Sequence, residues 1–238
     1  TGRPGRFIMI YIEFWADYTC PFCYIGFTEL QNALQKLGIG RQVRIRHRAV
    51  MLHPDAPSDD SVSLMDVATG KYGHSRYNAE LMARRIEDRG ETIGLSIAMK
   101  DLKSQNTMSA HRMAKYAELS GQGEAFEQRL FEAYFEEGRL IANPDVLIEI
   151  AAEAGLDVDK AQEIVRNELL YADEVRHDLA QAQSMQIQGV PLFVFDRKYV
   201  INGAQEQQAF EEVLAKAQRG ERSRSIAAFR PLKPALRS

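Results

Sequence analysis

The chain contains two cysteines, Cys20 and Cys23, separated by two residues. They lie in the stretch "DYTCPFCYIG", after an apolar run and at the start of a helical pattern. Such a pair could be a dithiol that cycles with a disulfide, half of a metal site, or two inert buried thiols. A bridge between these positions closes too short a loop to stabilise the fold much. The spacing therefore points to chemistry rather than to a structural crosslink.

Redox chemistry needs a thiolate, whereas a free cysteine is mostly protonated at neutral pH. A helix that begins at Pro21 places Cys20 against unpaired N–H groups and the positive end of the helix dipole, which stabilise an anion. Pro21 suits the first helical position because its missing N–H would be unpaired there anyway. Cys23 then lies one turn further in, close enough to bridge. We therefore expect Cys20 to attack and Cys23 to resolve the mixed disulfide.

A zinc site is the competing interpretation of the cysteine pair. Zinc usually takes four ligands, so a second pair at suitable spacing would be expected. None of the five histidines forms a second compact pair: His47, His53, His74, His111 and His177. We therefore expect no metal, and dithiol chemistry needs no organic cofactor. Inert buried thiols are common, but the order of strand, CxxC and helix favours a redox pair.

The elements that must position the cysteines follow from the patterns around them. Residues 7–15 are rich in Ile, Phe, Tyr and Trp and predict a buried strand. Apolar residues at three- and four-residue spacing predict a helix from Pro21 to Leu37, ended by Gly38. Residues 43–50 alternate and predict a second strand, so the fold class is α/β. The outward face of this second strand carries three arginines that we expect to be solvated: Arg44, Arg46 and Arg48.

Helical patterns follow for over a hundred residues before the next strands. One helix is expected to end at Gly90, and a long one is expected over 168–188. After Gly189, two apolar runs joined by Asp196-Arg197 predict a hairpin, and a last helix is predicted over 206–218. The expected organisation has four parts: an N-terminal half over 8–58, an inserted helical domain over 59–167, a C-terminal half over 168–218 and a basic tail over 219–238.

Composition excludes several classes of protein. The net charge of -3 argues against a dedicated nucleic-acid binder, which is usually basic. No run of 18 apolar residues is present, so we expect no membrane span. The N-terminal stretch "TGRPGRFIM" has no apolar region of a secretory signal. We expect residues 1–8 to be partly a cloning remnant or the end of a removed leader, and we favour a cytoplasmic location.

Several motifs together carry a specific resemblance. The stretch "CPFCYIG" after an apolar strand, with "GVPLFVF" about 170 residues later and a helical segment between them, resembles the DsbA-like thioredoxin-fold oxidoreductases. The stretches "NTMSAHR", "LFEAYFEEG" and "INGAQ" resemble the FrnE-type branch of that family. The similarity covers about residues 9–218. It implies a thioredoxin-like fold with a large all-helical domain inserted between a βαβ half and a ββα half.

The resemblance also implies roles for residues outside the cysteine pair. It implies a cis bond between Val190 and Pro191, uncommon in folded proteins, in a loop that faces the CxxC pair. Such a loop offers backbone groups to an extended substrate, which makes Val190 and Pro191 candidate substrate-binding residues. Glu13 lies near the position where relatives keep a buried acid that relays protons to the second cysteine, with an offset that differs by one. Solvation at the edge of the core explains Glu13 equally well.

Three further positions are weaker candidates. Asp17 precedes the cysteines and could simply shape the turn. His111 and Arg112 match the "AHR" part of the family motif and could face the cleft from the helical domain, although a helix-surface or core position explains them as well. The best-known oxidants of the family have Pro-His between the cysteines. Here Phe22 replaces the histidine and cannot donate a hydrogen bond, so a weaker oxidant, a reductase or an isomerase is equally compatible.

The predicted function is a thiol–disulfide oxidoreductase that works through a reversible Cys20–Cys23 disulfide. Its partner would be a thiol or disulfide substrate, either a protein or a small molecule such as glutathione. We expect neither a nucleic acid nor a membrane as a partner. The sequence is compatible with an oligomer. The alternative is a glutathione-dependent isomerase or transferase of the kappa or 2-hydroxychromene-2-carboxylate isomerase type, which typically carries serine at the first cysteine. A non-catalytic binding module is a third hypothesis, and the intact motifs count against it.

Overall fold

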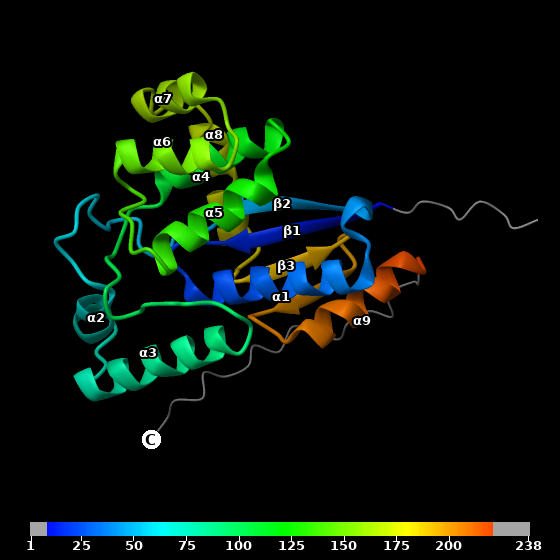
Figure 1. Cartoon of the computed structure of the whole chain (residues 1–238), viewed down its shortest axis with the longest axis horizontal. Helices are drawn as coiled ribbons and strands as arrows, with labels where there is room; N and C mark the ends of the chain where they lie inside the picture. Colours follow the sequence, from blue (N-terminus) through cyan, green and yellow to red (C-terminus); the bar gives the residue numbers. More distant parts are fainter. Residues whose placement is uncertain (1–8, 221–238) are drawn as a thin grey trace, which may run out of the picture.

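A four-stranded mixed sheet forms the centre of the protein, which we describe from a computed structural model over residues 9–220 (Figure 1). The strand order is β2-β1-β3-β4, with β1 parallel to β2 and antiparallel to β3, and β3 antiparallel to β4. The strands are β1 (Ile10–Ala16), β2 (Val43–Ala49), β3 (Leu192–Phe195) and β4 (Tyr199–Asn202). This arrangement confirms the predicted thioredoxin-like α/β fold.

Helices α1 (Pro21–Leu37) and α9 (Gln207–Gln218) contact each other and cover one face of this sheet (Figure 1). Helix α1 begins and ends where the sequence predicts. Pro21 occupies its first position, and Gly38 ends it in the left-handed conformation, with a φ of 65° and its N–H donating to the Gln35 carbonyl. Local signals at both ends therefore determine the length of the helix that carries the cysteines.

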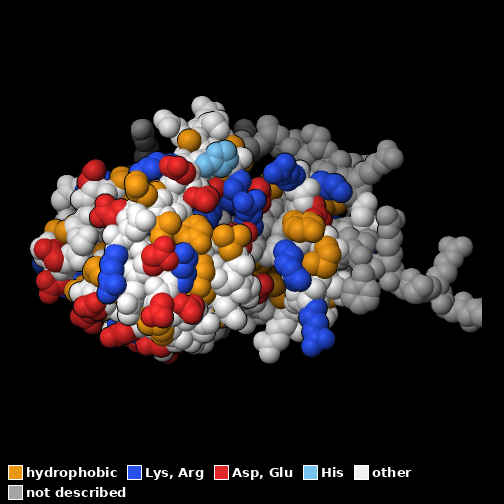
Figure 2. Space-filling view, turned by 90° about the horizontal axis from the view of Figure 1, so that it is seen from above, with side chains coloured by type: hydrophobic (Ala, Val, Ile, Leu, Met, Phe, Trp, Pro, Cys, Tyr) orange, Lys and Arg blue, Asp and Glu red, His pale blue; other side chains and the backbone are white. Residues whose placement is uncertain are grey.

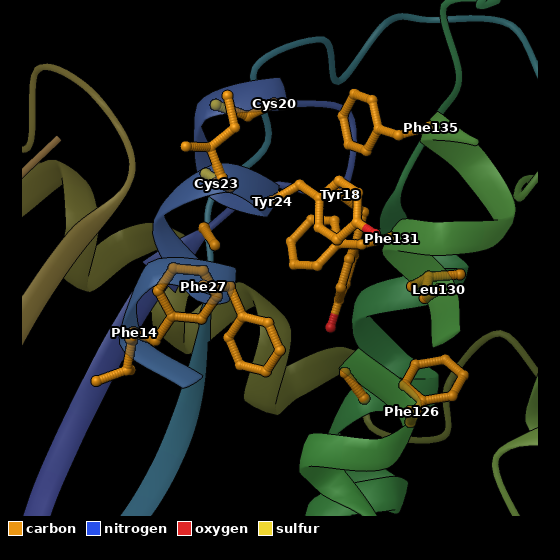
Figure 3. Close-up of a cluster of buried hydrophobic side chains, with 14 of the residues drawn as sticks. Phe14, Tyr18, Cys20, Cys23, Tyr24, Phe27, Phe126, Leu130, Phe131 and Phe135 are labelled. Carbon is orange, nitrogen blue, oxygen red and sulfur yellow. The ribbon is translucent and has the colours of Figure 1, made fainter. Parts of the chain in front are cut away.

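The segment between β2 and β3 is helical, apart from its connecting loops. It contains α2 (Leu64–Asp66), the π-helical turn η2 (Val67–Lys71), α3 (Arg76–Glu91), α4 (Met108–Leu119), α5 (Gly123–Phe135), α6 (Pro144–Glu153), α7 (Val158–Arg166) and α8 (Ala172–Ser184). A short 3-10 turn, η1 (Gly40–Gln42), precedes β2. Aromatic side chains of α5 pack directly against α1 (Figure 3) and join one hydrophobic core with the sheet. The domain boundaries at 58/59 and 167/168 stay a prediction.

Two helices, α3 and α8, have bounds that differ from the sequence prediction. Helix α3 continues past Gly90 to Glu91, because Gly90 does not adopt the left-handed conformation by which Gly38 ends α1. The Ile97 side chain packs closely on Gly90, where a Cβ would lie 3.0 Å from Ile97 Cδ1. Helix α8 begins only at Ala172, since Tyr171 before it is left-handed with a φ of 60°. It ends at Ser184 instead of at 188, and Met185 after it is exposed.

The arginine stripe of β2 is only partly solvated. Arg44 and Arg46 are exposed as predicted, but the prediction for Arg48 is wrong. The Arg48 guanidinium is buried because it donates to Asp178 of α8 at 2.6 Å and lies 5.1 Å from the centre of the Trp15 ring. Most of the predicted basic tail, residues 221–238, lies outside the described residues. Among residues 9–220, no helix is both long and apolar enough to cross a bilayer.

Candidate functional site

The two cysteines lie on the first turn of α1 (Figure 3). Cys20 is the residue that precedes the helix, and its carbonyl accepts hydrogen bonds from the N–H groups of Cys23 at 2.9 Å and Tyr24 at 3.4 Å. The Cys20 N–H donates to the Asp17 carbonyl at 3.1 Å. Both thiols are free and buried, with 4% of Cys20 and none of Cys23 exposed. Cys20 is therefore the more accessible of the two.

Cys23 lies in surroundings that favour its neutral form. Burial raises the pKa of the Cys23 thiol well above its ordinary value, and a hydrogen bond with Cys20 and the charge of Cys20 raise it further. A backbone hydrogen bond with Asp17 acts in the opposite direction and is too weak to reverse the shift. Cys23 therefore carries its proton when the pair is reduced. Any reaction that makes its sulfur a nucleophile must remove that proton.

The loop before β3 closes over the first cysteine. The Val190–Pro191 peptide bond is cis. The Cys20 thiol donates to the Val190 carbonyl at a distance of 3.7 Å between sulfur and oxygen. The loop is held in place from its other side, where the Gly203 N–H donates to the Pro191 carbonyl at 2.8 Å. Two segments 170 residues apart in the sequence thus meet at the Cys20 sulfur.

Gly26 makes this close approach of α1 to the proline loop sterically feasible. A Cβ on Gly26 would lie 3.1 Å from Pro191 Cγ and 3.2 Å from two ring atoms of Phe193. We expect Gly26→Ala to lower the free energy of unfolding by about 1 kcal/mol, because overpacking of roughly 1–3 kcal/mol exceeds the gain in helix propensity. Urea denaturation measures the change. Gly40→Ala is the control, since a Cβ there meets nothing within 4 Å; equal stability of the two variants would contradict the packing argument.

The weaker candidates separate into those near the cysteines and those far from them. Pro21 lies at the first position of α1, and Phe22 beside it is 44% exposed. Asp17 is fully buried, its carboxylate accepts the Leu52 N–H at 2.6 Å, and its charge acts on Cys23. Glu13 instead pairs with two arginines at 3.7 Å, Arg48 and Arg197. The buried acid beside the cysteines is therefore Asp17.

His111 and Arg112 are neighbours on α4 but have different surroundings. His111 is fully buried, with its Nε2 3.2 Å from the Val50 carbonyl and 3.6 Å from Asp17 Oδ1. The Arg112 guanidinium donates to carbonyls at the end of α7, at 2.6 Å for Ile164 and 2.9 Å for Asn167. Arg112 therefore caps the C-terminal end of α7. His111 instead lies beside Asp17, close to the cysteines.

Sequence reasoning missed two buried residues near His111: His47 and Glu127. His47 shares the inward face of β2 with Val43 and Ile45, and an ionisable side chain on such a face is a detectable signal. Glu127 occupies the same inward stripe of α5 as Leu130. Both residues could have been noticed because they are ionisable and lie in apolar patterns. Neither pattern identifies the side chain that each residue contacts.

An open cavity of about 1410 Å³ lies against β1, β2 and the β3–β4 hairpin, and neither cysteine is among its described lining residues. The charged residues that line it come from the strands, from the hairpin and from the ends of helices: Glu13, Arg44, Arg46, Glu118, Glu124, Asp196, Arg197 and Lys198. Figure 2 shows basic and apolar side chains side by side in the half of the molecule nearer to the grey terminal residues. Within residues 9–220, no three His, Cys, Asp or Glu side chains are grouped to hold a metal ion.

A free CxxC pair on the first turn of a helix, with a cis-proline loop against the first sulfur, is the arrangement of a thioredoxin-like thiol oxidoreductase. The chain matches the family model of the DSBA-like thioredoxin domain over residues 11–215 and belongs to that family. The resemblance found in the sequence is thereby confirmed at the level of the family, and the FrnE-type branch stays a prediction.

Several known proteins are similar to this chain over most of its length. The uncharacterized protein YwbO of Bacillus subtilis is 26% identical over 212 residues, which cover 88% of this chain and 98% of that protein. A probable DsbA oxidoreductase from Streptomyces coelicolor is 31% identical, with a TM-score of 0.82 over 90% of this chain and 91% of the other. A 2-hydroxychromene-2-carboxylate isomerase shares the fold at 16% identity and a TM-score of 0.67, covering 88% of this chain and 97% of its own.

Proposed function

We propose that the protein exchanges electrons with a thiol or disulfide substrate through a reversible Cys20–Cys23 disulfide. The observation that carries this proposal is the free thiol of Cys20 at the N-terminus of α1, 3.7 Å from the Val190 carbonyl. In the oxidising direction, a substrate thiolate attacks Cys20 of the disulfide and Cys23 leaves. A second substrate thiolate then displaces Cys20 and completes the substrate disulfide. The reverse sequence reduces a disulfide.

Val190 and Pro191 are proposed to hold the substrate beside Cys20. Among the described residues, the Val190 N–H donates to no acceptor, although its carbonyl accepts from the Cys20 thiol. An extended substrate can pair with such a free backbone group as an added strand does. This chemistry suits a protein or a small disulfide such as oxidised glutathione. A cytoplasmic location stays part of the proposal.

The reduction potential of the Cys20–Cys23 pair tests the function. The protein is equilibrated in glutathione buffers of graded ratio, and the fraction of disulfide is measured after acid quenching and thiol alkylation. We expect a single two-electron transition within the range that glutathione buffers span. If no Cys20–Cys23 disulfide forms at any ratio, the proposal is wrong. Redox-independent turnover of 2-hydroxychromene-2-carboxylate with glutathione would then favour the isomerase alternative.

Phe22 is expected to influence this potential. We expect Phe22→His to raise it, because a histidine N–H would stabilise the reduced, thiolate form of the pair. A rise of about 30 mV would correspond to roughly 1.4 kcal/mol for two electrons. The same glutathione titration measures it, and the 44% exposure of Phe22 leaves room for the imidazole. Phe22→Leu, which adds no donor, is the control; an equal rise in both variants would exclude the hydrogen bond as the cause.

A further inference from the structure

Lys71 and His53 lie together on the surface, and the exchange reaction as described uses neither of them. The Lys71 Nζ lies 3.4 Å from His53 Nδ1 and 6.0 Å from the centre of the Tyr72 ring. The His53 ring meets the Tyr72 ring edge-on, with 6.0 Å between their centres. His53 belongs to the loop after β2, whereas Lys71 ends the π-helical turn η2. The fold thus joins a cation and two rings from two segments.

This group lies at the end of the sheet that carries the cysteines. Strands β1 and β2 are parallel, so Cys20 after β1 and His53 after β2 follow the same end of the sheet (Figure 1). The Leu52 N–H donates to the Asp17 carboxylate at 2.6 Å, and the Asp17 carbonyl accepts the Cys20 N–H at 3.1 Å. The charge of Asp17 also acts on His53. A substrate at Cys20 is therefore bound at the end of the sheet where this group is located.

The segment that contains the group lies entirely on the surface. All of residues 51–78 are described by the structure, and none of them is buried. Lys71 is exposed, Tyr72 is 54% exposed, and His53 is partly buried. A π-helical turn such as η2 is rare and occurs frequently at functional sites. The Lys71 side chain is therefore accessible to a ligand and is not needed by the core.

Lys71 has hydrogen-bond donors that the protein leaves free. Burial and the charge of Lys71 lower the pKa of His53, so the imidazole is neutral at pH 7 and its Nδ1 accepts one ammonium proton. An ammonium has three such donors. Among residues 9–220, no Asp or Glu side chain pairs with Lys71 or His53. The chain has 33 acidic and 30 basic residues, so the unpaired lysine does not result from a shortage of acids. An anion from outside the chain can therefore bind here.

We propose that Lys71 binds a carboxylate of the thiol substrate, so that the protein prefers small peptide thiols of the glutathione class; this role rests on the proposed exchange function. Glutathione carries carboxylates on both sides of the cysteine that holds its sulfur. The sulfur can meet Cys20 and the peptide backbone can meet the Val190 N–H while one carboxylate reaches the Lys71 ammonium. His53 is a positioning residue, because it holds that ammonium. A neutral or cationic thiol lacks the group that Lys71 binds.

Lys71 takes part in no bond that is made or broken. When glutathione disulfide is reduced, the Cys20 thiolate attacks one sulfur, and the other glutathione leaves as a thiolate with the electron pair of the broken S–S bond. Cys23 then loses its proton to solvent and attacks Cys20, which releases the second glutathione thiolate. The cysteine pair is oxidised by two electrons, and the substrate is reduced by two. Lys71 holds the carboxylate throughout, so it accelerates only substrates that carry one.

Lys71→Met tests the proposal, because methionine keeps much of the apolar stem and removes the charge. The reduced protein is mixed with anionic glutathione disulfide, neutral hydroxyethyl disulfide or cationic cystamine, and acid quenching with thiol alkylation measures the rate of protein oxidation. With glutathione disulfide we expect the variant to react about tenfold more slowly, because one charge-assisted hydrogen bond is lost. It should keep the parent rate with hydroxyethyl disulfide and react no more slowly with cystamine. His53→Leu should lower the ratio of the glutathione disulfide rate to the hydroxyethyl disulfide rate.

Lys198→Met is the matched control. Lys198 is an exposed lysine of the β3–β4 hairpin and lines the open cavity, whose described lining includes neither cysteine, so this variant should keep all three parent rates. Lys71→Arg retains the charge and should retain the preference for glutathione disulfide. Equal glutathione disulfide rates in the parent and Lys71→Met, or an equal loss with all three disulfides, would overturn the carboxylate site and leave the exchange function intact. A parent protein that reacts with none of the three would instead overturn the exchange function.

Discussion

Replacing Cys20 with serine is expected to abolish disulfide exchange, whereas replacing Cys23 with serine is expected to produce a protein that traps its substrate. Without Cys20, the remaining thiol is fully buried and its pKa is raised, so it neither reaches a substrate nor ionises readily. Without Cys23, Cys20 can still attack, but nothing resolves the mixed disulfide. Mass spectrometry of the intact protein after incubation with a disulfide measures the trapped adduct.

The double variant Cys20→Ser with Cys23→Ser is the control, and it should trap nothing. A trapped adduct on Cys20→Ser, with none on Cys23→Ser, would reverse the order of attack.

Asp178→Asn is expected to lower the free energy of unfolding by about 3–5 kcal/mol, the usual cost of breaking a buried ion pair on one side. Asp178 is 1% exposed and accepts from Arg48 at 2.6 Å, from the Ala49 N–H at 3.0 Å and from Lys115. The neutral amide leaves the buried Lys115 without its anion, and it leaves Arg48 with only Glu13, at 3.7 Å. Urea denaturation at neutral pH measures the loss.

Asp173→Asn on the same helix is the matched control, because Asp173 pairs with Arg176 at 2.8 Å but its side chain is 92% exposed. We expect that variant to lose less than about 1 kcal/mol, as exposed pairs do. Similar losses in both variants would mean that the burial of Asp178 contributes nothing to the effect.

The pH dependence of the Asp178 effect has a defined sign. Burial alone would raise the pKa of Asp178, but contacts with Lys115, Ala49 and Arg48 hold it below its ordinary value. A carboxylate with a lowered folded-state pKa contributes stability above the unfolded value of about 3.9 and loses it as the pH falls through the folded value. The difference between the parent and Asp178→Asn should therefore shrink in acid. A difference that grows in acid would contradict the ion pair.

Features with local causes could be predicted from the sequence. The bounds of α1 follow from Pro21 at its start and Gly38 after its end, and the cysteine pair follows from its place on the first turn. The hairpin of β3 and β4 turns at Asp196 and Arg197, which both adopt positive φ angles. Each of these signals lies within a few residues of the structure that it determines.

Features that depend on distant partners could not be predicted. The burial of Arg48 needs Asp178, which is 130 residues away in the sequence. The pairing of His47 with Glu127 spans 80 residues, and its pairing with His111 spans 64. A periodic pattern identifies an inward face, but it does not identify which ionisable side chain will meet another there. Such contacts exist only after the inserted helices have packed on the sheet.

Trp15 makes the proline loop optically observable. It is the only tryptophan in the chain and is fully buried on β1. Its ring packs with Leu192 in a small cluster that Val190 also contacts. The tryptophan fluorescence of the protein therefore comes from a single indole next to the loop that closes over Cys20. Emission intensity can follow substrate docking and disulfide formation in real time, in unlabelled protein and without competing emission from a second tryptophan.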